Sequence, residues 1–453
     1  MSISSVFDIS QKSLAAYQEA LDVTSNNISN ASNTDYSRQQ VVLTPSQPQQ
    51  LGNFIFGTGV ELGSIQRASD ALTNSQIRTN NQKYSDNNQR STILNQVQQL
   101  FSEPSSTGLS SLSTAFFNSW QQLSVTPNST ALRNNVIQAA QNLSSQIQNI
   151  NDGLNSVKSD LTSEANGQVT QLNADIKQVQ NLNAQIFQAQ NSGQQPNDLL
   201  DQRDKVLNDL SNIANVNISF DSGNSAQVSI GGVFVADRAT YTQLQLSNTN
   251  GKISLTTTDG SATASLNGGT LFALTDMYDN TIPSYQSSLD GYVNNLMNSV
   301  NAQHSTGYTI NNPPQTLANF FSSYQSGTLT INPAIVQDPN KIAVSSDGTA
   351  GNGNIALNIA NLINQKNANG TSLLDTYNQL ISKIGNDTQS ATNSAQSYQL
   401  VLKQLQTQKA SISGVSTDEE MSNVIQYQKS YDASAKIMSI ASQMLDTLIA
   451  MVV

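Results

Sequence analysis

Apolar residues recur every seven positions at both ends of the chain, which is the spacing that keeps one seam of a helix against a partner helix. The N-terminal row is Phe7, Leu14, Leu21 and Ile28, with a weaker companion row that includes Tyr17. The C-terminal row is Val424, Tyr431, Met438, Leu445 and Val452, flanked by Met421. We predict that these two helices pair as a coiled coil at one pole of the molecule and carry its assembly interface.

A third zone of seven-residue spacing occupies the middle of the chain. Its two rows begin at Val136 and Ala140 and run side by side as far as Leu161. Past Gly167 the pattern restarts one residue out of register. The shift indicates either a helical hairpin or a local unwinding of one long helix. We interpret the zone as the packed core of a helical domain.

The period of the apolar residues changes to two after this zone. Val216, Ile218 and Phe220 alternate with polar residues, and Gly and Asn turns separate this run from the runs that follow. Short alternating runs of this kind are typical of antiparallel strands. We therefore predict a β domain over residues 214–270, a helix over 271–303 and further helices from about residue 355.

The predicted fold is mainly α with inserted β structure, in an elongated molecule of several domains. The paired terminal helices form one pole, a helical bundle comes next, and the antiparallel β insertion lies outermost. The predicted domains are a terminal helical assembly domain (1–66 and 412–453), a helical bundle (67–213, 271–303 and 355–411), the β insertion (214–270) and a mixed β and loop segment (304–354).

Composition and charge exclude several classes of function. The chain has 453 residues and a net charge of −11, and its basic residues form no block, so we expect no nucleic-acid binding. No segment approaches 18 consecutive apolar residues, so we expect no membrane insertion. The N-terminus lacks the basic and apolar regions of a cleavable signal peptide, so we expect any export to use another route.

Few residues offer candidate chemistry. The chain has no cysteine and one histidine, which excludes disulfides, thiolate chemistry and almost every multi-histidine metal site. The densest charged cluster is Asp198, Asp201, Arg203, Asp204, Lys205 and Asp209. Asp201 and Lys205 lie four residues apart, so we expect a helix-stabilising ion pair between them. We predict no catalytic residue, no cofactor and no metal in this protein.

Two other features have structural interpretations. His304 lies at a predicted helix end, where a cation or a hydrogen-bond donor suits the exposed carbonyl groups. The glycine-rich segment 348–353 lacks the Lys-Ser/Thr of a phosphate-binding loop, so we interpret it as a turn.

Motifs at both ends and in the middle of the chain resemble those of one family. The terminal motifs are residues 20–30 (ALDVTSNNISN), 36–39 (YSRQ), 414–421 (GVSTDEEM), 427–431 (YQKSY) and 444–448 (MLDTL). They resemble signatures shared by flagellar rod, hook and hook-associated proteins. The internal motifs are 197–204 (NDLLDQRD), 300–304 (VNAQH) within 285–308, 331–333 (INP) and 338–339 (DP). They narrow the resemblance to the flagellar hook-associated protein 1 family.

The resemblance implies a secreted, extracellular structural subunit of the bacterial flagellum, located at the hook–filament junction and exported unfolded by the flagellar type III apparatus. Its implied partners are the hook protein, the second hook-associated junction protein and further copies of itself, which together form a helical ring. We also expect an export chaperone at the exposed C-terminal helix. The chain departs from the family at Thr34-Asp35, in the turn after the first helix, and at Asn352, where an acidic residue is expected.

Other interpretations remain open from the sequence alone. Another flagellar axial protein, such as a hook, rod or flagellin-like protein, would share the terminal motifs but not the internal ones. A surface adhesin with a helical stalk would use the β insertion to bind its ligand. An enzyme hidden in the insertion is a third alternative.

Overall fold

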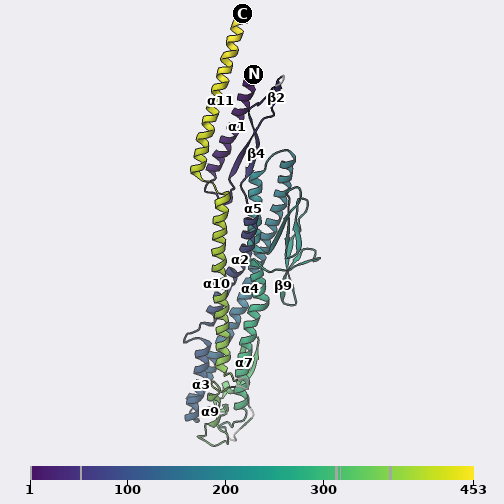
Figure 1. Cartoon of the computed structure of the whole chain (residues 1–453). Helices are drawn as coiled ribbons and strands as arrows, with labels where there is room; N and C mark the ends of the chain where they lie inside the picture. The colour runs from purple at the N-terminus through teal and green to yellow at the C-terminus, as the bar shows by residue number, and fades with distance from the viewer. Residues whose placement is uncertain (1–2, 52–53, 312–314, 317, 367–369, 453) are drawn as a thin grey trace.

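The molecule is elongated, and its two terminal helices lie side by side at one end (Figure 1). The computed structural model describes residues 3–51, 54–311, 315–316, 318–366 and 370–452. Helices α1 (Ile3–Ser29) and α11 (Thr417–Val452) pack against each other and form this terminal pole. The predicted mainly α fold with inserted antiparallel strands is therefore confirmed.

A bundle of long helices forms the body of the molecule. Helix α2 runs along α10, and α4 packs on both α3 and α5. One π-helical turn, Met277–Thr281, joins α6 to α7. The three elements together form the helix that was predicted over residues 271–303. The helices of the bundle are α2 (Ala71–Phe101), α3 (Leu109–Val125), α4 (Thr130–Asn191), α5 (Asn197–Ile213), α6 (Thr270–Asp276), α7 (Ile282–His304), α9 (Asn354–Asn361) and α10 (Leu373–Ser413).

Helix α4 runs through the whole body as one element of 62 residues. It begins after Ser129, whose hydroxyl oxygen accepts a hydrogen bond from the Leu132 N–H. Its buried seam passes Gly167 in successive four-residue steps, at Val157, Leu161, Ala165 and Val169. These steps produce the register shift seen in the sequence without ending the helix. The hairpin alternative is therefore excluded.

Two three-stranded antiparallel sheets make up the β insertion. They lie on the flank of the bundle beside α4 (Figure 1). Amide side chains on α4 hold them there: Asn183 donates to Ala226 O (2.8 Å) and accepts from the Ala226 N–H (3.0 Å). Asn173 forms the same two-way pair with Leu244. The strands are β5 (Val216–Phe220), β6 (Ala226–Ile230), β7 (Val233–Ala236), β8 (Leu244–Thr249), β9 (Lys252–Thr257) and β10 (Thr263–Ala264).

Four strands follow α1, in a segment that the sequence analysis assigned to a helical domain. Strand β1 (Gln39–Pro45) pairs antiparallel with β4 (Val60–Arg67), and β2 (Gln49–Leu51) pairs with β3 (Phe54–Phe56). The alternation of Val60 and Leu62 was a partial signal for β4, which a register shift opposite Val42 and Leu43 interrupts before Ile65. The terminal domain is therefore helical only in α1 and α11.

The end of the molecule opposite the termini holds α3, α9 and the mixed segment (Figure 1). Its aromatic core centres on Trp120, whose ring centroid lies 5.2 Å from that of Phe320 and 6.1 Å from that of His304. The remaining elements are β11 (Phe321–Gln325), β12 (Thr328–Ile331), α8 (Pro333–Gln337) and a 3-10 turn (Pro339–Lys341).

Candidate assembly interface

Small side chains line the contact between α1 and α11. Buried positions on α1 include Ser13, Ala16 and Ala20. Those on α11 are Glu420, Ser434 and Ala441, and the half-buried Tyr427 completes a seven-residue spacing between them. Small residues let two helix backbones approach closely, and the Tyr17 and Tyr427 rings pack across the same contact, with centroids 6.4 Å apart. The helix pair therefore has a narrow seam between small residues.

The residues predicted to form the assembly interface border this seam. The half-buried ones are Phe7, Leu14, Tyr17, Leu21, Ile28, Val424, Tyr431 and Met438. Met421 and Leu445 are exposed, and the side chain of Val452 lies outside the described residues. These side chains therefore keep apolar surface available to other chains, and their role in assembly stays a prediction.

The last turns of α11 extend beyond α1 (Figure 1). Every side chain from residue 442 to residue 451 is exposed, although many of them are apolar. The exposed apolar residues along this helix form a stripe, which we call the α11 stripe: Ile437, Ile440, Met444, Leu448 and Met451. An apolar stripe that its own chain leaves exposed is a candidate surface for contact with another chain.

A second apolar surface lies on β3, and the sequence analysis did not identify it. Phe54 is 69% exposed and Ile55 is 73% exposed. The hairpin that carries them lies beside α1, near its N-terminal end (Figure 1). The three consecutive apolar residues Phe54–Phe56 could have predicted this surface. A two-stranded hairpin has no core of its own, so some of three consecutive large apolar side chains are exposed in it.

A polar cluster joins the two terminal motifs at the base of the helix pair. The Asn27 side-chain oxygen accepts hydrogen bonds from Tyr36 Oη–H (2.8 Å) and from the Gln39 N–H (3.0 Å). Its amide nitrogen donates to Gln39 O (2.8 Å) and to the buried Glu420 carboxylate (3.1 Å). Arg38 forms an ion pair with Glu420 at 2.8 Å. Motifs almost 400 residues apart in the sequence therefore meet here.

The internal motif at the start of α5, residues 197–204, also contacts residues 36–39. Asp201 accepts hydrogen bonds from the Ser37 N–H (2.9 Å) and hydroxyl (2.7 Å), and pairs with Arg67 (2.7 Å). The expected pair of Asp201 with Lys205 is wrong, because Asp201 points to Arg67 and Ser37. Lys205 pairs with Asp209 instead (2.9 Å). We call the polar contacts of Asn27, 36–39, Arg67, 197–204 and Glu420 the junction cluster.

The junction cluster keeps Tyr36 in its protonated form. Burial, with the nearby carboxylates of Asp198, Asp201 and Glu420, raises the pKa of Tyr36 to about 12. The phenol therefore remains a hydrogen-bond donor to Asn27 at any pH at which the protein works.

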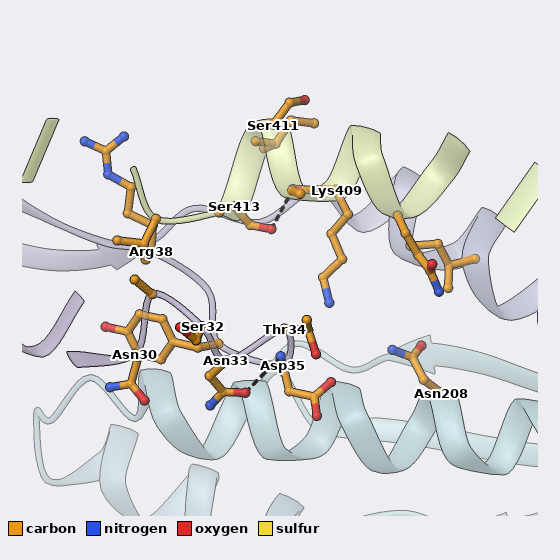
Figure 2. A pocket seen from close by; sticks show the side chains of 18 of the residues that line it. Asn30, Ser32, Asn33, Thr34, Asp35, Arg38, Asn208, Lys409, Ser411 and Ser413 are labelled. Atoms are coloured by element: carbon orange, nitrogen blue, oxygen red, sulfur yellow. Dashed lines mark hydrogen bonds between the residues drawn. The ribbon is translucent and has the colours of Figure 1, made fainter. Parts of the chain in front are cut away.

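A cavity of about 910 Å³ lies on the opposite side of the same turn, between residues 30–36 and the end of α10. Figure 2 shows Thr34 and Asp35 on one wall and Lys409 and Ser413 on another. The Asp35 N–H donates to the side-chain oxygen of Asn33 (3.1 Å), so the Thr34-Asp35 departure sits in a closed turn. The Arg38 N–H donates to Ser413 O (2.8 Å), so the end of α10 is also bound to the terminal pole.

His304 has a structural role, as expected, but not as a cation. It is fully buried; its Nδ1–H donates to Ala318 O (2.6 Å), and its Nε2 accepts from the Ala343 N–H (2.9 Å). Burial lowers the pKa of His304 to about 4, so the ring is neutral at pH 7. Of the two roles expected for His304, cation or hydrogen-bond donor, the neutral ring has the second. It donates to the Ala318 carbonyl and not to the exposed carbonyls of the helix end, and it joins two loops.

Other candidate chemistry also has structural explanations. In the turn 348–353, Asn352 donates to the Asp347 carboxylate (2.9 Å) and accepts from the Asn354 N–H (3.0 Å), which closes the turn with an amide in place of an acid. Across the described ranges, no group of three or more His, Cys, Asp or Glu residues could hold a metal ion. No described helix is both long enough and apolar enough to cross a membrane.

Comparison with known proteins gives a consistent result. A family model described as the flagellar hook-associated protein FlgK helical domain matches residues 94–321, just over half of the chain. A model of the C-terminal region of flagellar basal body rod FlgEFG proteins matches residues 406–451. The second match covers the end of α10 and nearly all of α11.

Relatives match this chain along nearly the whole length of both proteins. Flagellar hook-associated protein 1 of Bacillus subtilis is 28% identical over 493 residues, covering 98% of this chain and 97% of that protein. The Salmonella typhimurium protein of the same name is 24% identical and covers 99% and 100%, respectively. The solved structure of the flagellar hook junction protein FlgK from Burkholderia pseudomallei has the same fold, with a TM-score of 0.66 at 16% identity over 75% of this chain and 100% of that one. The chain belongs to the flagellar hook-associated protein FlgK family, whose members are structural proteins of the flagellum and not enzymes.

Proposed function

We propose that this protein forms a layer of the hook–filament junction by helical self-assembly of its paired terminal helices. The observation that carries the proposal is the α11 stripe, which is apolar, exposed and continued beyond the end of α1. A head-to-tail contact repeated around an axis builds a helical ring, and such a contact needs apolar surface outside the seam of each helix pair. The match of 406–451 to the C-terminal region of flagellar basal body rod proteins supports this role, because α11 is then similar to a segment of other flagellar proteins.

The proposed partners are the hook protein on one side, the second hook-associated protein on the other, and copies of this chain within the layer. In the subunit, the predicted residues Leu14, Leu21, Met421 and Leu445 all keep surface exposed beside the seam. We assign them, with Phe7, Tyr17, Ile28, Val424, Tyr431, Met438 and Val452, to contacts between terminal helices.

Export unfolded through the flagellar type III apparatus suits this chain, because a chain without cysteine cannot be crosslinked before it arrives. Before assembly, residues 442–451 have no tertiary contacts that bury their side chains, and helix propensity alone stabilises such a short segment weakly. An export chaperone that covers the α11 stripe would protect it from aggregation.

Substitution within the stripe tests the proposal. Replacing Ile440 and Met444 together by serine removes apolar surface that is exposed in the subunit, so the fold of the body should not change. We expect cells with this double variant to export the protein, complete their hooks and carry at least about tenfold fewer filaments, since two apolar contacts contribute about 1.5–3 kcal/mol each. Electron microscopy of the cells counts the filaments.

A matched control is the replacement of Gln443, an exposed polar residue on the same turn, by serine. This variant should carry normal numbers of filaments. Normal filaments on cells with the double variant, at normal export, would contradict the proposed interface.

A further inference from the structure

A cleft of about 920 Å³ lies between β4, the start of α2, the loop from α4 to α5, and β5. Three of the seven arginines of this weakly charged chain line it: Arg67, Arg78 and Arg203. They lie close enough for Arg67 and Arg78 to disfavour the charge on Arg203. The cleft is separate from the α11 stripe and from the cavity shown in Figure 2.

The negative charge at the cleft is already in use. Asp204 lines the cleft and pairs with Arg67 (2.8 Å), and Asp201 behind it also pairs with Arg67 (2.7 Å). Both nearby carboxylates therefore bind the same guanidinium. Asp221 caps its own turn through the Gly223 and Ser225 N–H groups. Asp221 also lies near enough to favour the charge on Arg203. None of these three carboxylates forms an ion pair with Arg78.

Arg78 lies near Asp204 but forms no direct ion pair with it. It is only 9% exposed, and within the described part of the chain it has no hydrogen bond or ion pair. Its side chain lines the cleft, so its five N–H donors are available there. Burial lowers the pKa of Arg78, which reports the cost of holding an unpaired cation in this position.

Arg203 adds a second unused donor. Its Nη1 donates to the side-chain oxygen of Asn183 and to the Asn224 carbonyl, and its guanidinium lies over the Phe220 ring. Its Nε is buried and has no acceptor among the described residues. Buried donors in proteins are nearly always paired, so the unpaired guanidinium of Arg78 beside this cleft indicates a missing acceptor.

We propose that this cleft binds an oxyanion, held by Arg78 with support from Arg203. A guanidinium binds a carboxylate or a phosphate through two parallel hydrogen bonds, which a neutral ligand cannot reproduce. The cleft is much larger than a single anion, and the amides of Gln66, Gln190 and Gln194 line it beside the arginines. These dimensions suit an aspartate or glutamate side chain with its flanking backbone, presented by an adjoining subunit. A free phosphate or carboxylate is the other source of the same chemistry.

Thermal unfolding of the full-length subunit tests the site. We expect succinate and inorganic phosphate to raise the unfolding midpoint of the wild-type chain saturably, and uncharged succinamide to have no such effect. Arg78→Gln should weaken the apparent affinity for both anions at least about tenfold, because it removes a charge-assisted pair of hydrogen bonds. Arg78→Lys keeps the charge but loses the planar guanidinium. Its apparent affinity for both anions should lie between that of the wild type and that of Arg78→Gln.

The matched control is Lys83→Gln, which removes an exposed cation from the same helix outside the cleft. It should respond to both anions as the wild type does. The titration of the wild type can overturn the proposal without the variants. The proposal fails if neither anion produces a saturable shift of the unfolding midpoint. It also fails if Arg78→Gln responds with the same affinity as the wild type.

Filament counts distinguish the two sources of the anion. If an adjoining subunit supplies a carboxylate, cells with Arg78→Gln carry fewer filaments than cells with Lys83→Gln. If a free anion is the ligand, both variants carry normal filaments while the purified wild type still binds phosphate. Only the filament counts rest on the proposed function. The unfolding experiment tests anion binding alone, so it can succeed when the assembly proposal fails, and the reverse.

Discussion

Single polar side chains fix how the terminal pole meets the body. The side-chain oxygen and nitrogen of Asn27 both form hydrogen bonds, with Tyr36, Gln39 and Glu420. Both carboxylate oxygens of Asp201 accept hydrogen bonds, from Ser37 and Arg67. Each of these residues binds groups from another part of the chain, so none can be replaced without leaving a buried polar group unpaired. Asn27 and Asp201 thus hold the terminal pole and the body of the subunit together.

Replacement of Asp201 by asparagine should weaken the junction cluster. The variant loses its ion pair with Arg67 and one of its two acceptor oxygens, so we expect about 2–3 kcal/mol less protection of the Ser37 amide in hydrogen exchange. Asp209→Asn on the same helix is the control, since its pair with Lys205 is exposed and should contribute less than about 1 kcal/mol. Equal protection in both variants would show that Asp201 does not secure the turn.

His304 should make the far end of the molecule sensitive to acid. Its pKa is about 4 in the fold, against 6.5 for a histidine in the unfolded chain, so below pH 6.5 the unfolded chain binds the proton more readily. The stabilisation by His304 is complete above that pH and is lost as the pH falls toward 4, by about 3 kcal/mol in all. Urea unfolding at pH 7 and pH 5, followed by the fluorescence of Trp120 beside the ring, measures this.

The control for His304 is a variant that cannot titrate. His304→Gln should be less stable at pH 7, because a flexible amide replaces two fixed hydrogen bonds of the ring, but it should lose less stability between pH 7 and pH 5. An equal loss in the wild type and the variant would assign the acid sensitivity to other groups.

At the scale of elements, α4 holds the body together although a glycine interrupts its pattern. A Cβ at Gly167 would meet nothing within 4 Å, whereas a Cβ at Gly153 would lie 2.8 Å from Leu100 Cδ2. Gly167→Ala should therefore stabilise the protein by about 0.5–1 kcal/mol, since glycine weakens a helix interior by that amount. Gly153→Ala, on the same helix, should gain less or lose stability. Thermal unfolding of both variants checks this, and a destabilised Gly167→Ala would indicate that the helix is distorted there.

Elements whose burial follows one simple period could be predicted from the sequence. The rows through Val136 and Ala140 predicted the seam of α4, and the alternation at Val216 predicted β5. Strands β1 to β4 could not be predicted with the same ease, because they pair in two-stranded sheets whose faces are only partly buried. Their pattern of apolar residues is therefore weak.

The candidate site was less predictable than the fold. Seven-residue spacing located the terminal helices, but the seam between them uses Ala20, Ser434 and Ala441, which carry little hydrophobic signal. Asp201 was expected to pair within its own helix, because sequence spacing shows the neighbour at position 205 and cannot show Arg67, which a different element brings closer. Pairing across elements depends on tertiary structure, which a local pattern does not contain.

At the scale of the whole molecule, the chain is rich in Asn and Gln, and these amides have a role separate from that of its apolar ends. Amides such as Asn173 and Asn183 bind strand backbones to α4 in the body, where they satisfy buried polar groups without adding charge. Apolar surface that the subunit does not bury is prominent at the terminal pole, on the α11 stripe and on the β3 hairpin. Single apolar residues of the body, such as Val125 and Leu400, are exposed as well, but the terminal pole has the longer apolar stripe.

Deletion of residues 442–453 tests the central claim, that the terminal pole is completed by neighbouring subunits. Every side chain from 442 to 451 is exposed in the subunit, so the deletion should leave the unfolding of the body, monitored at Trp120, unchanged. We expect cells with the truncated chain to build hooks without filaments and to shed filament protein into the medium. Normal filaments on these cells would contradict the account.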